Sequence, residues 1–205
     1  MNPNRWELDP NKFLSKEDAS RLQAVAKRQA ESGEHVAIRD YFIIRLGLAT
    51  GLRVMEIAAL KCGDLGLEDT IPSLVVVHGK GRKRRRVFVN NPFKKQCKEF
   101  LTWKQHIGES IEPDQPLLLS SSTGGHLTTR AIQKAFKRCA RRAGLLSHYS
   151  IHSLRHTYAC FLLKASKWNL RLVQKQLGHS KITTTQVYAD VMMPEIKKAL
   201  DKLYI

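Results

Sequence analysis

The segment VAIRDYFIIRLGLATG, residues 36–51, constrains the fold more than any other stretch of this 205-residue chain. It is strongly apolar along its whole length and it ends at Gly51. A helix that is hydrophobic on nearly all sides has to be buried. Glycine commonly ends a helix because it adopts the left-handed conformation without strain. We therefore predict a buried helix here.

Four further segments have helical spacing: residues 13–30, 53–65, 91–107 and 128–144. The first begins with Ser15 as its predicted N-cap, followed by Glu17 and Asp18 in a pattern that resembles a capping box. From Ser150 onward the spacing is helical almost throughout, with a break at Gly178.

Two of these helices have a predicted inner side. In residues 91–107 it consists of Phe93, Cys97, Leu101 and Trp103. In residues 128–144 it consists of Ile132, Phe136, Cys139 and Ala143, with Gly144 as the stop. The other side of the second helix carries six cations: Arg130, Lys134, Lys137, Arg138, Arg141 and Arg142.

The spacing changes in SLVVVHGKGRKRRRVFVN, residues 73–90. β-Branched runs from Leu74 to Val77 and from Val87 to Val89 flank a turn rich in Gly and Arg, which predicts a β-hairpin. Residues 112–128 are predicted to form a loop, a short apolar strand and a second loop. The fold class that follows is α+β, mostly α-helical, with a small antiparallel sheet.

The charge of the chain indicates its partner class. Thirty-five Lys and Arg against 18 Asp and Glu give a net charge of +17 and a pI near 10.0. Such an excess favours a nucleic-acid partner, because basic groups displace the counterions condensed on it. Structural RNA-binding proteins share this charge, so it predicts no activity by itself.

Nothing in the sequence indicates a membrane or an exported protein. No run of about 18 apolar residues is present, and MNPNRWELDP lacks the apolar core of a signal peptide. The four cysteines, Cys62, Cys97, Cys139 and Cys160, form no C-x-x-C pair. We interpret them as reduced thiols of a cytoplasmic protein.

The stretch SIHSLRHTYA, residues 150–159, fits either a metal or an anion. His152 and His156 have the helical spacing of a zinc pair, but the general-base glutamate of H-E-x-x-H is replaced by Ser153, and Arg155 repels a cation. As an anion site, Ser150 is the N-cap and places His152 in the first helical turn, where free N–H groups favour negative charge. A surface arginine beside a core histidine is the plainer alternative.

Other candidate residues are scattered along the chain. Arg53 follows a glycine break and precedes Glu56 by three positions, as in a surface salt bridge or a fixed anion-binding arginine. Lys80 lies between two glycines at the predicted hairpin tip, followed by a basic run that also suits a solvated hairpin. His179 follows a helix end, and Tyr188 alone suits core packing.

Together these motifs resemble one family. TGLRVMEI around Arg53, GKGRKRR around Lys80, HSLRHTYA with His152 and Arg155, and LGHSKITTTQVY to Tyr188 are similar to the tyrosine recombinases of the phage-integrase and Xer type. The order of the motifs matches as well. The resemblance runs from about Phe13 to the C-terminus and implies the catalytic-domain fold of that family.

The resemblance implies that Tyr188 attacks a DNA phosphodiester, leaving a 3′-phosphotyrosine and a free 5′-hydroxyl. His152 would accept the tyrosine proton, and Lys80 would protonate the departing oxygen. A base is needed because tyrosine has a pKa near 10.

The remaining implied roles concern the phosphate. Arg53 and Arg155 would bind its non-bridging oxygens, His179 would add a hydrogen bond, and Glu56 would support the site from behind. Two arginines that stay charged neutralise the phosphorane, so we expect no metal and no other cofactor. We expect no need for ATP, because the phosphotyrosine would keep the bond energy for rejoining.

Double-stranded DNA is the expected partner. The predicted DNA-binding residues are the cationic side of the 128–144 helix and the hairpin cations Arg82, Lys83, Arg84, Arg85 and Arg86. Apolar residues at 192, 196, 200 and 203 repeat in the tail and favour packing on a neighbouring protomer, in a homo-oligomer of up to four subunits on DNA. The expected location is cytoplasmic, associated with the nucleoid.

We expect residues 1–12 to be an N-terminal extension and residues 13–205 the catalytic domain, without the N-terminal core-binding domain usual in the family. The predicted function is site-specific recombination or integration of DNA. A type IB topoisomerase-like relaxing activity and a non-catalytic DNA-binding factor on the same scaffold are the alternatives.

Overall fold

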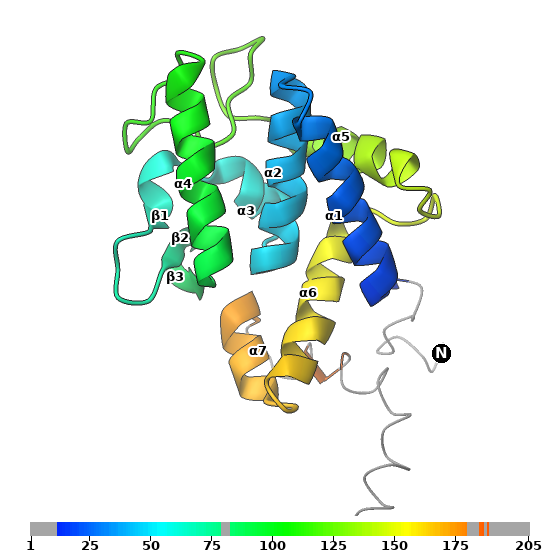
Figure 1. Ribbon diagram of the computed structural model, residues 1–205. Coiled ribbons are helices and arrows are strands. Elements are labelled where there is room, and N and C mark those ends of the chain that lie inside the picture. The colour runs from blue at the N-terminus through cyan, green and yellow to red at the C-terminus, as the bar shows by residue number, and fades with distance from the viewer. Residues whose placement is uncertain (1–11, 79–82, 180–184, 187, 189–205) are drawn as a thin grey trace, which may run out of the picture.

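Helices make up most of the structure, a computed structural model that describes residues 12–78, 83–179, 185, 186 and 188 (Figure 1). The helices are α1 (Lys16–Ala30), α2 (His35–Thr50), α3 (Val54–Ala59), α4 (Asn91–His106), α5 (Thr129–Arg142), α6 (Ile151–Ala165) and α7 (Leu170–Leu177). The strands are β1 (Leu65–Gly66), β2 (Ser73–His78) and β3 (Lys83–Phe88). The predicted fold class, mostly helical α+β, is confirmed.

α2 lies at the centre of the main core. The side chains of Phe42, Ile43, Ile44 and Leu46 are at most 2% exposed, and α1, α4, α5 and α6 all pack against this helix. Gly51 caps it with a left-handed φ of 61°. The buried helix predicted from residues 36–51 is therefore confirmed.

α1 begins where its cap residue predicts. The hydroxyl of Ser15 accepts a hydrogen bond from the N–H of Asp18 at 3.0 Å, which satisfies one of the free donors of the first turn. α5 also agrees with its predicted inner side, since Ile132, Phe136 and Cys139 are at most 1% exposed.

The sheet is antiparallel in the order β1-β2-β3, and its β2–β3 hairpin is the predicted one. Leu74 pairs with Val87, and Val76 with Arg85. Leu74, Val76 and Val87 are at most 1% exposed and form the inner face. β1 was not predicted, because a two-residue strand has no periodicity to detect.

Two expectations about side chains and strands are wrong. On α4 the most buried residues after Phe93 and Cys97 are Phe100 and Lys104, whereas the predicted Leu101 and Trp103 are only partly buried. The α-helical repeat from Phe93 favours these positions, because spacings of seven and eleven residues return to the same face.

The second wrong expectation concerns residues 112–128. They contain isolated β-bridges, one of which joins Leu119 to His126, rather than the predicted short strand. A single bridged pair holds the two sides of the loop together, but it does not extend into a ladder of paired residues.

α6 and α7 form a second, smaller core with Tyr188. Ala159, Cys160, Leu163, Val173 and Leu177 are at most 1% exposed there. Lys167 and Trp168 take positive φ values of 51° and 66° in the reversal between the two helices, a break that the sequence pattern does not predict.

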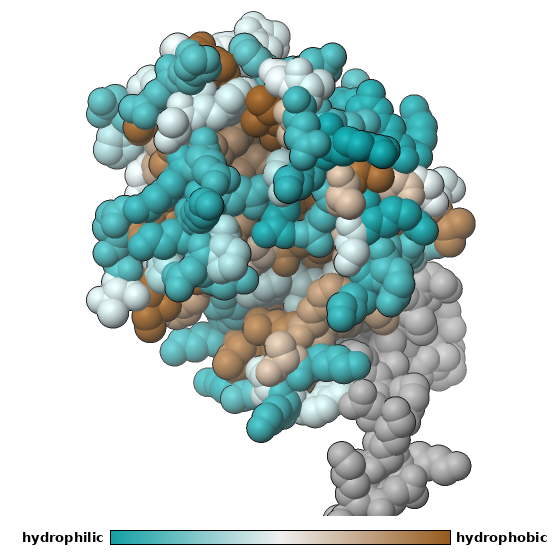
Figure 2. Space-filling model, viewed as in Figure 1, coloured by the Kyte–Doolittle hydropathy of each residue, from teal (hydrophilic) through white to brown (hydrophobic). Residues whose placement is uncertain are grey.

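In Figure 2 the hydropathy of the surface differs between the helices of the main core and those of the smaller core. Hydrophilic side chains cover most of α1 and α4, whereas hydrophobic ones gather over α6 and α7. Phe161, Trp168 and Leu172 are the large exposed hydrophobic residues of that region. In the part of the chain that the structure describes, no helix combines the length and hydrophobicity of a membrane span.

The cysteines Cys62, Cys97, Cys139 and Cys160 are all buried and unpaired. Burial raises the pKa of Cys97 and of Cys160 to about 12, so neither is a thiolate at neutral pH.

Phe42 provides a test of the main core. Its ring stacks on Phe100 of α4 with centroids 3.8 Å apart, so Phe42→Ala leaves a cavity between α2 and α4. We expect a loss of about 3–5 kcal/mol in the free energy of unfolding, measured by denaturant titration. Val36→Ala, at a half-exposed position on the same helix, should stay within about 0.5 kcal/mol of the parent. Equal losses in the two variants would contradict this packing.

Candidate active site

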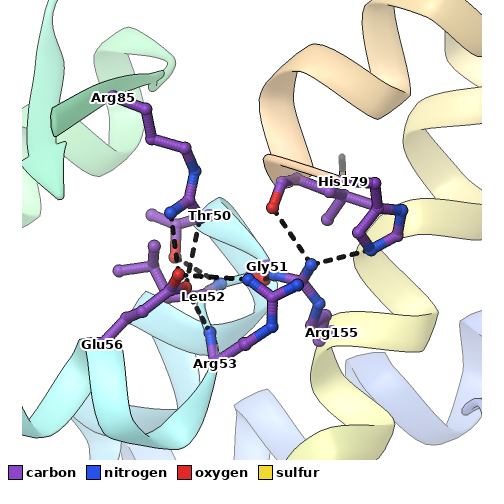
Figure 3. A network of polar contacts seen from close by, with 9 residues as sticks. Thr50, Gly51, Leu52, Arg53, Glu56, Arg85, Arg155 and His179 are labelled. Carbon is purple, nitrogen blue, oxygen red and sulfur yellow. Dashed lines mark hydrogen bonds and ion pairs between the residues drawn. The ribbon is translucent and has the colours of Figure 1, made fainter. Parts of the chain in front are cut away.

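Arg155 of α6 is the most deeply enclosed cation of the candidate site. It is 6% exposed. Its Nη1 donates to the carbonyl of Gly51 at 2.6 Å, and its Nη2 donates to the carbonyl of Leu177 at 3.0 Å and to Nε2 of His179 at 2.9 Å (Figure 3). Burial, and next repulsion by Arg53, lower the pKa of Arg155 to about 10, so the group remains charged at neutral pH.

Glu56 of α3 forms a second cluster with two arginines. Arg85 of β3 donates from Nη1 and Nη2 to the two carboxylate oxygens at 2.7 and 3.1 Å. The N–H of Arg53 donates to Oε2 at 2.8 Å, and its Nη1 donates to Oε1 at 3.3 Å. Burial alone raises the pKa of Glu56, but the bonds from Arg85 and Arg53 outweigh it and hold this pKa below its ordinary value.

Glu56 therefore fixes the side chain of Arg53. Figure 3 shows the guanidinium groups of Arg53 and Arg155 beside one another. The side chain of Arg53 is 34% exposed, so of these two cations it is the one open to solvent. Two adjacent guanidinium groups of this kind suit an anion with several oxygens.

Arg85 differs from its predicted place among the DNA-facing cations. Its guanidinium is turned inward because Glu56, 3% exposed at its side chain, needs a charged partner. Gly178, the residue that ends α7, packs closely against the side chain of Arg85. A Cβ on Gly178 would lie 2.6 Å from Nε of Arg85, and Gly178 has a φ of 68°. A glycine is required at this position on both grounds.

Gln176 of α7 also holds the hairpin, a role that the sequence did not predict. Its Oε1 accepts from the N–H of Phe88 at 3.3 Å, and its Nε2 donates to the carbonyl of Phe88 at 2.6 Å. The side-chain amide thus pairs with the backbone at the end of β3 as a neighbouring strand would. No sequence signal distinguishes this glutamine from an exposed helical one.

His179 is neutral in this arrangement. A guanidinium has no acceptor, so Nε2 of His179 must accept the bond from Arg155 and carries no proton. The proton is then on Nδ1, which donates to the hydroxyl of Thr185 at 3.0 Å. Burial, followed by the charge of Arg155, lowers the pKa of His179 to about 4, in agreement with this state.

Tyr188 lies against the same group of residues. It is 4% exposed, and its ring is nearly parallel to that of His179, with centroids 6.4 Å apart. Its hydroxyl is 3.1 Å from Nδ1 of His156. Burial raises the pKa of Tyr188 to about 12, while the charges of Arg155 and Arg53 act in the opposite direction.

His152 lies in the first turn of α6, one turn before His156. It is exposed and lines a hollow of about 360 Å³ at the start of the helix. The other residues that line it are Arg130, Gln133, Lys134, Lys137, Ser150 and Ile151. This hollow is basic, so it suits an anionic group on the surface rather than a metal ion.

Three of the six predicted cations of α5 bond to neighbouring segments, and these are Lys137, Arg138 and Arg142. Arg138 forms a two-point ion pair with the buried carboxylate of Asp40 at 2.9 Å, and Lys137 donates to the carbonyls of Ser147 and Tyr149 at 2.6 Å. These bonds join α5 to its neighbours. Arg142 donates to Gln29 of α1 at 3.0 Å. The remaining three predicted cations of this helix are Arg130, Lys134 and Arg141.

Of the predicted site residues, the structure brings together Arg53, Glu56, Arg155, His179 and Tyr188. It puts His156, which was not predicted as a site residue, beside the phenol of Tyr188, whereas His152 lines the hollow beside α5. Lys80 and Arg82 lie outside the described residues. Within the described part of the chain, no three His, Cys, Asp or Glu side chains are grouped as metal ligands would be.

A family model supports the resemblance carried by these motifs. The model of the phage integrase family matches residues 12–195, most of the chain. The chain belongs to the phage integrase family.

Curated relatives within the family carry the name tyrosine recombinase XerC. The protein of Lactobacillus leichmannii is 34% identical over 169 residues, which cover 82% of this chain and 56% of the relative. That of Thermodesulfovibrio yellowstonii is 32% identical over 194 residues, covering 93% of this chain and 62% of the relative. The chain thus spans just over half the length of these relatives.

A solved structure agrees with the fold. The XerH site-specific recombinase bound to its difH substrate in a pre-cleavage complex is 27% identical, with a TM-score of 0.72. The match covers 92% of this chain and 52% of XerH. The fold is accordingly that of the tyrosine recombinase catalytic domain, as the resemblance implied.

Glu56→Gln tests the cluster that fixes Arg53. Removing the buried charge leaves two guanidinium groups without a counterion, so we expect a loss of about 3 kcal/mol in the free energy of unfolding near neutral pH. The parent should also lose stability as the pH falls below about 4, because protons then neutralise a carboxylate whose pKa is depressed in the folded state. The variant should lose less over that range.

Denaturant titrations at neutral and acid pH measure both effects. Glu99→Gln, an exposed carboxylate on α4, is the matched control and should retain the acid sensitivity of the parent. An equal pH dependence in the parent and in Glu56→Gln would contradict the assigned role of Glu56.

Proposed function

We propose that this protein breaks and rejoins DNA through a covalent phosphotyrosyl intermediate, as a site-specific recombinase or integrase. One observation carries the proposal: the ring of Tyr188 lies nearly parallel to that of His179, which is bonded to Arg155, and the guanidinium of Arg155 lies beside that of Arg53. A tyrosine beside two fixed cations is suited to attack a phosphodiester, whose negative charge increases as the new bond forms. The curated relatives with the name tyrosine recombinase support the same assignment.

In the proposed reaction, the oxygen of Tyr188 forms a bond to the scissile phosphorus, and the bond to the 5′ oxygen breaks. Arg53 and Arg155 bind the non-bridging oxygens. When Nε2 of His179 is released from Arg155, it can carry a proton and donate a hydrogen bond to the phosphate. Lys80 supplies the proton to the departing 5′ oxygen. The phosphotyrosine conserves the bond energy, so the reverse attack by a 5′-hydroxyl rejoins DNA without ATP.

The proposed partner is double-stranded DNA. The net charge of +17 and the basic hollow at the start of α6 favour contact with the phosphate backbone. Arg130 and Lys134 line this hollow beside His152, on the side of α5 away from its buried residues. XerH was solved bound to its difH substrate, which supports the same partner class for this chain.

We further propose that residues 13–205 act as the catalytic unit and that several copies assemble on DNA. Complete strand exchange needs more than one active site, because each tyrosine cleaves a single strand. The predicted exchange of the C-terminal tail between protomers concerns residues outside the described part of the chain. Target choice and location at the nucleoid belong to the same proposal.

Adduct formation tests the reaction. On a nicked suicide duplex the parent should form a protein–DNA adduct that survives denaturation, because the cleaved strand diffuses away and cannot be rejoined. Tyr188→Phe should form none, and Arg53→Ala should form it about 10²- to 10³-fold more slowly, since one preorganised donor is lost. Denaturing gels over time measure both rates.

Arg21→Ala is the control for Arg53, since it removes an exposed cation of α1. It should leave the adduct rate unchanged. An adduct that persists in Tyr188→Phe would exclude this tyrosine as the nucleophile. Arg53 is a better probe than Arg155, whose three partners also hold the fold together.

Salt dependence tests the proposed backbone contact. In a plot of log affinity for duplex DNA against log salt, Arg130→Gln and Lys134→Gln should each reduce the slope by about 1, because each releases one fewer counterion. Fluorescence anisotropy over a range of salt concentrations gives the slopes. Lys95→Gln, an exposed cation of α4, should leave the slope unchanged. Unchanged slopes in all three variants would remove the hollow from the DNA-binding surface.

A further inference from the structure

Two histidines lie one turn apart on α6, and only one of them contacts the nucleophile. Nδ1 of His156 is 3.1 Å from the hydroxyl of Tyr188, and the two rings have centroids 5.8 Å apart. His152 is exposed and lines the basic hollow beside α5. A general base has to lie within hydrogen-bond reach of the proton that it takes, which favours His156 on geometry.

We propose that His156 is the residue that accepts the proton of Tyr188 when the phosphotyrosyl bond forms. The inference rests on the proposed function and replaces the role that the family resemblance gives to His152. In this assignment His152 faces the DNA backbone from the rim of the basic hollow, together with Arg130 and Lys134.

The surroundings of His156 keep it ready to accept a proton. The charged or titratable groups that face it are Arg155 and His152 on its own helix, Lys12 before α1, His179 after α7, and Tyr188. No carboxylate is among the groups that shift its pKa. Burial first, and then Arg155, His152 and Lys12, lower the pKa of His156 to about 4. At neutral pH the imidazole is therefore unprotonated, and Nδ1 can accept from the phenol.

The approach of DNA makes the proton transfer easier, because it raises the pKa of the acceptor and lowers the pKa of the donor. A phosphodiester bound by Arg53 and Arg155 brings a negative charge close to His156, and an adjacent anion raises the pKa of an imidazole. The phenol becomes more acidic as its oxygen bonds to phosphorus. The gap between the pKa of about 12 for Tyr188 and that of about 4 for His156 therefore narrows along the reaction.

The bond from the oxygen of Tyr188 to phosphorus forms, its O–H bond breaks, and the proton passes to Nδ1 of His156. The bond from phosphorus to the 5′ oxygen breaks, and that oxygen is protonated by the separate acid, proposed to be Lys80. In rejoining, the imidazolium returns its proton to the oxygen of Tyr188. No oxidant, reductant or further reactant is needed.

His156→Asn is the decisive variant. The amide oxygen of asparagine can occupy the position of Nδ1 and accept the hydrogen bond from Tyr188, but it cannot take up the proton. We expect adduct formation near neutral pH to slow by about 10²-fold or more, with DNA affinity unchanged. His106→Asn, on an exposed position of α4, is the control for loss of a histidine and should match the parent.

The pH profile separates a proton acceptor from a structural contact. Between about pH 6.5 and about pH 9 the parent should cleave at a nearly constant rate, because His156 is already unprotonated. In His156→Asn the rate should rise about tenfold per pH unit, as the phenolate has to form without a base. A purely structural loss would lower the rate equally at every pH.

A modified substrate separates the base from the acid. When sulfur replaces the bridging 5′ oxygen, the leaving group needs no proton, so this substrate should rescue a Lys80→Ala variant and leave His156→Asn slow.

The outcomes that overturn the inference are distinct from those that overturn the proposed function. Cleavage by His156→Asn at the rate of the parent, or with a parallel pH profile, excludes His156 as the acceptor. A steeper pH dependence in His152→Asn than in His156→Asn returns the role to His152. Absence of any adduct in the parent removes the proposed function, and this inference with it.

Discussion

The burial of one guanidinium group, that of Arg155, determines how the two cores of this protein meet. A buried charge is costly unless polar partners surround it. Here the partners are the carbonyls at the C-terminal ends of α2 and α7, where the helix dipoles are negative, together with Nε2 of His179. The same bonds that make the buried cation tolerable join the main core to the smaller core that contains Tyr188. The arrangement of the candidate site and the stability of the fold therefore both depend on this side chain.

A second charged cluster connects the sheet to this site. Glu56 is a buried carboxylate between Arg53 and Arg85, so the position of the hairpin and the orientation of Arg53 are coupled through a single residue. Gln176 and the close approach of Gly178 to Arg85 hold the end of β3 against α7. Arg53 is thus supported by a layer of contacts that no single motif in the sequence specifies.

Short-range features were predicted well because they depend on residues within a turn or two of one another. The caps at Ser15 and Gly51, the hairpin around Val76 and Val87, and the inner side of α5 follow from local conformational preference and spacing, and the structure confirms them. The failures have the same origin. A two-residue strand, a bridged loop and the exact face of α4 are decided by what packs against them, which spacing alone does not reveal.

The sequence by itself determined the residue types of the site, their order along the chain and, through motifs such as HSLRHTYA and LGHSKITTTQVY, the family. Only the tertiary structure decided which of these residues meet. It turned Arg85 inward to Glu56 and placed His156 rather than His152 beside Tyr188. The two histidines are equivalent in a helical pattern. Contact across 32 positions of sequence depends instead on how α6 and the segment of Tyr188 pack together, which is set by burial in the smaller core.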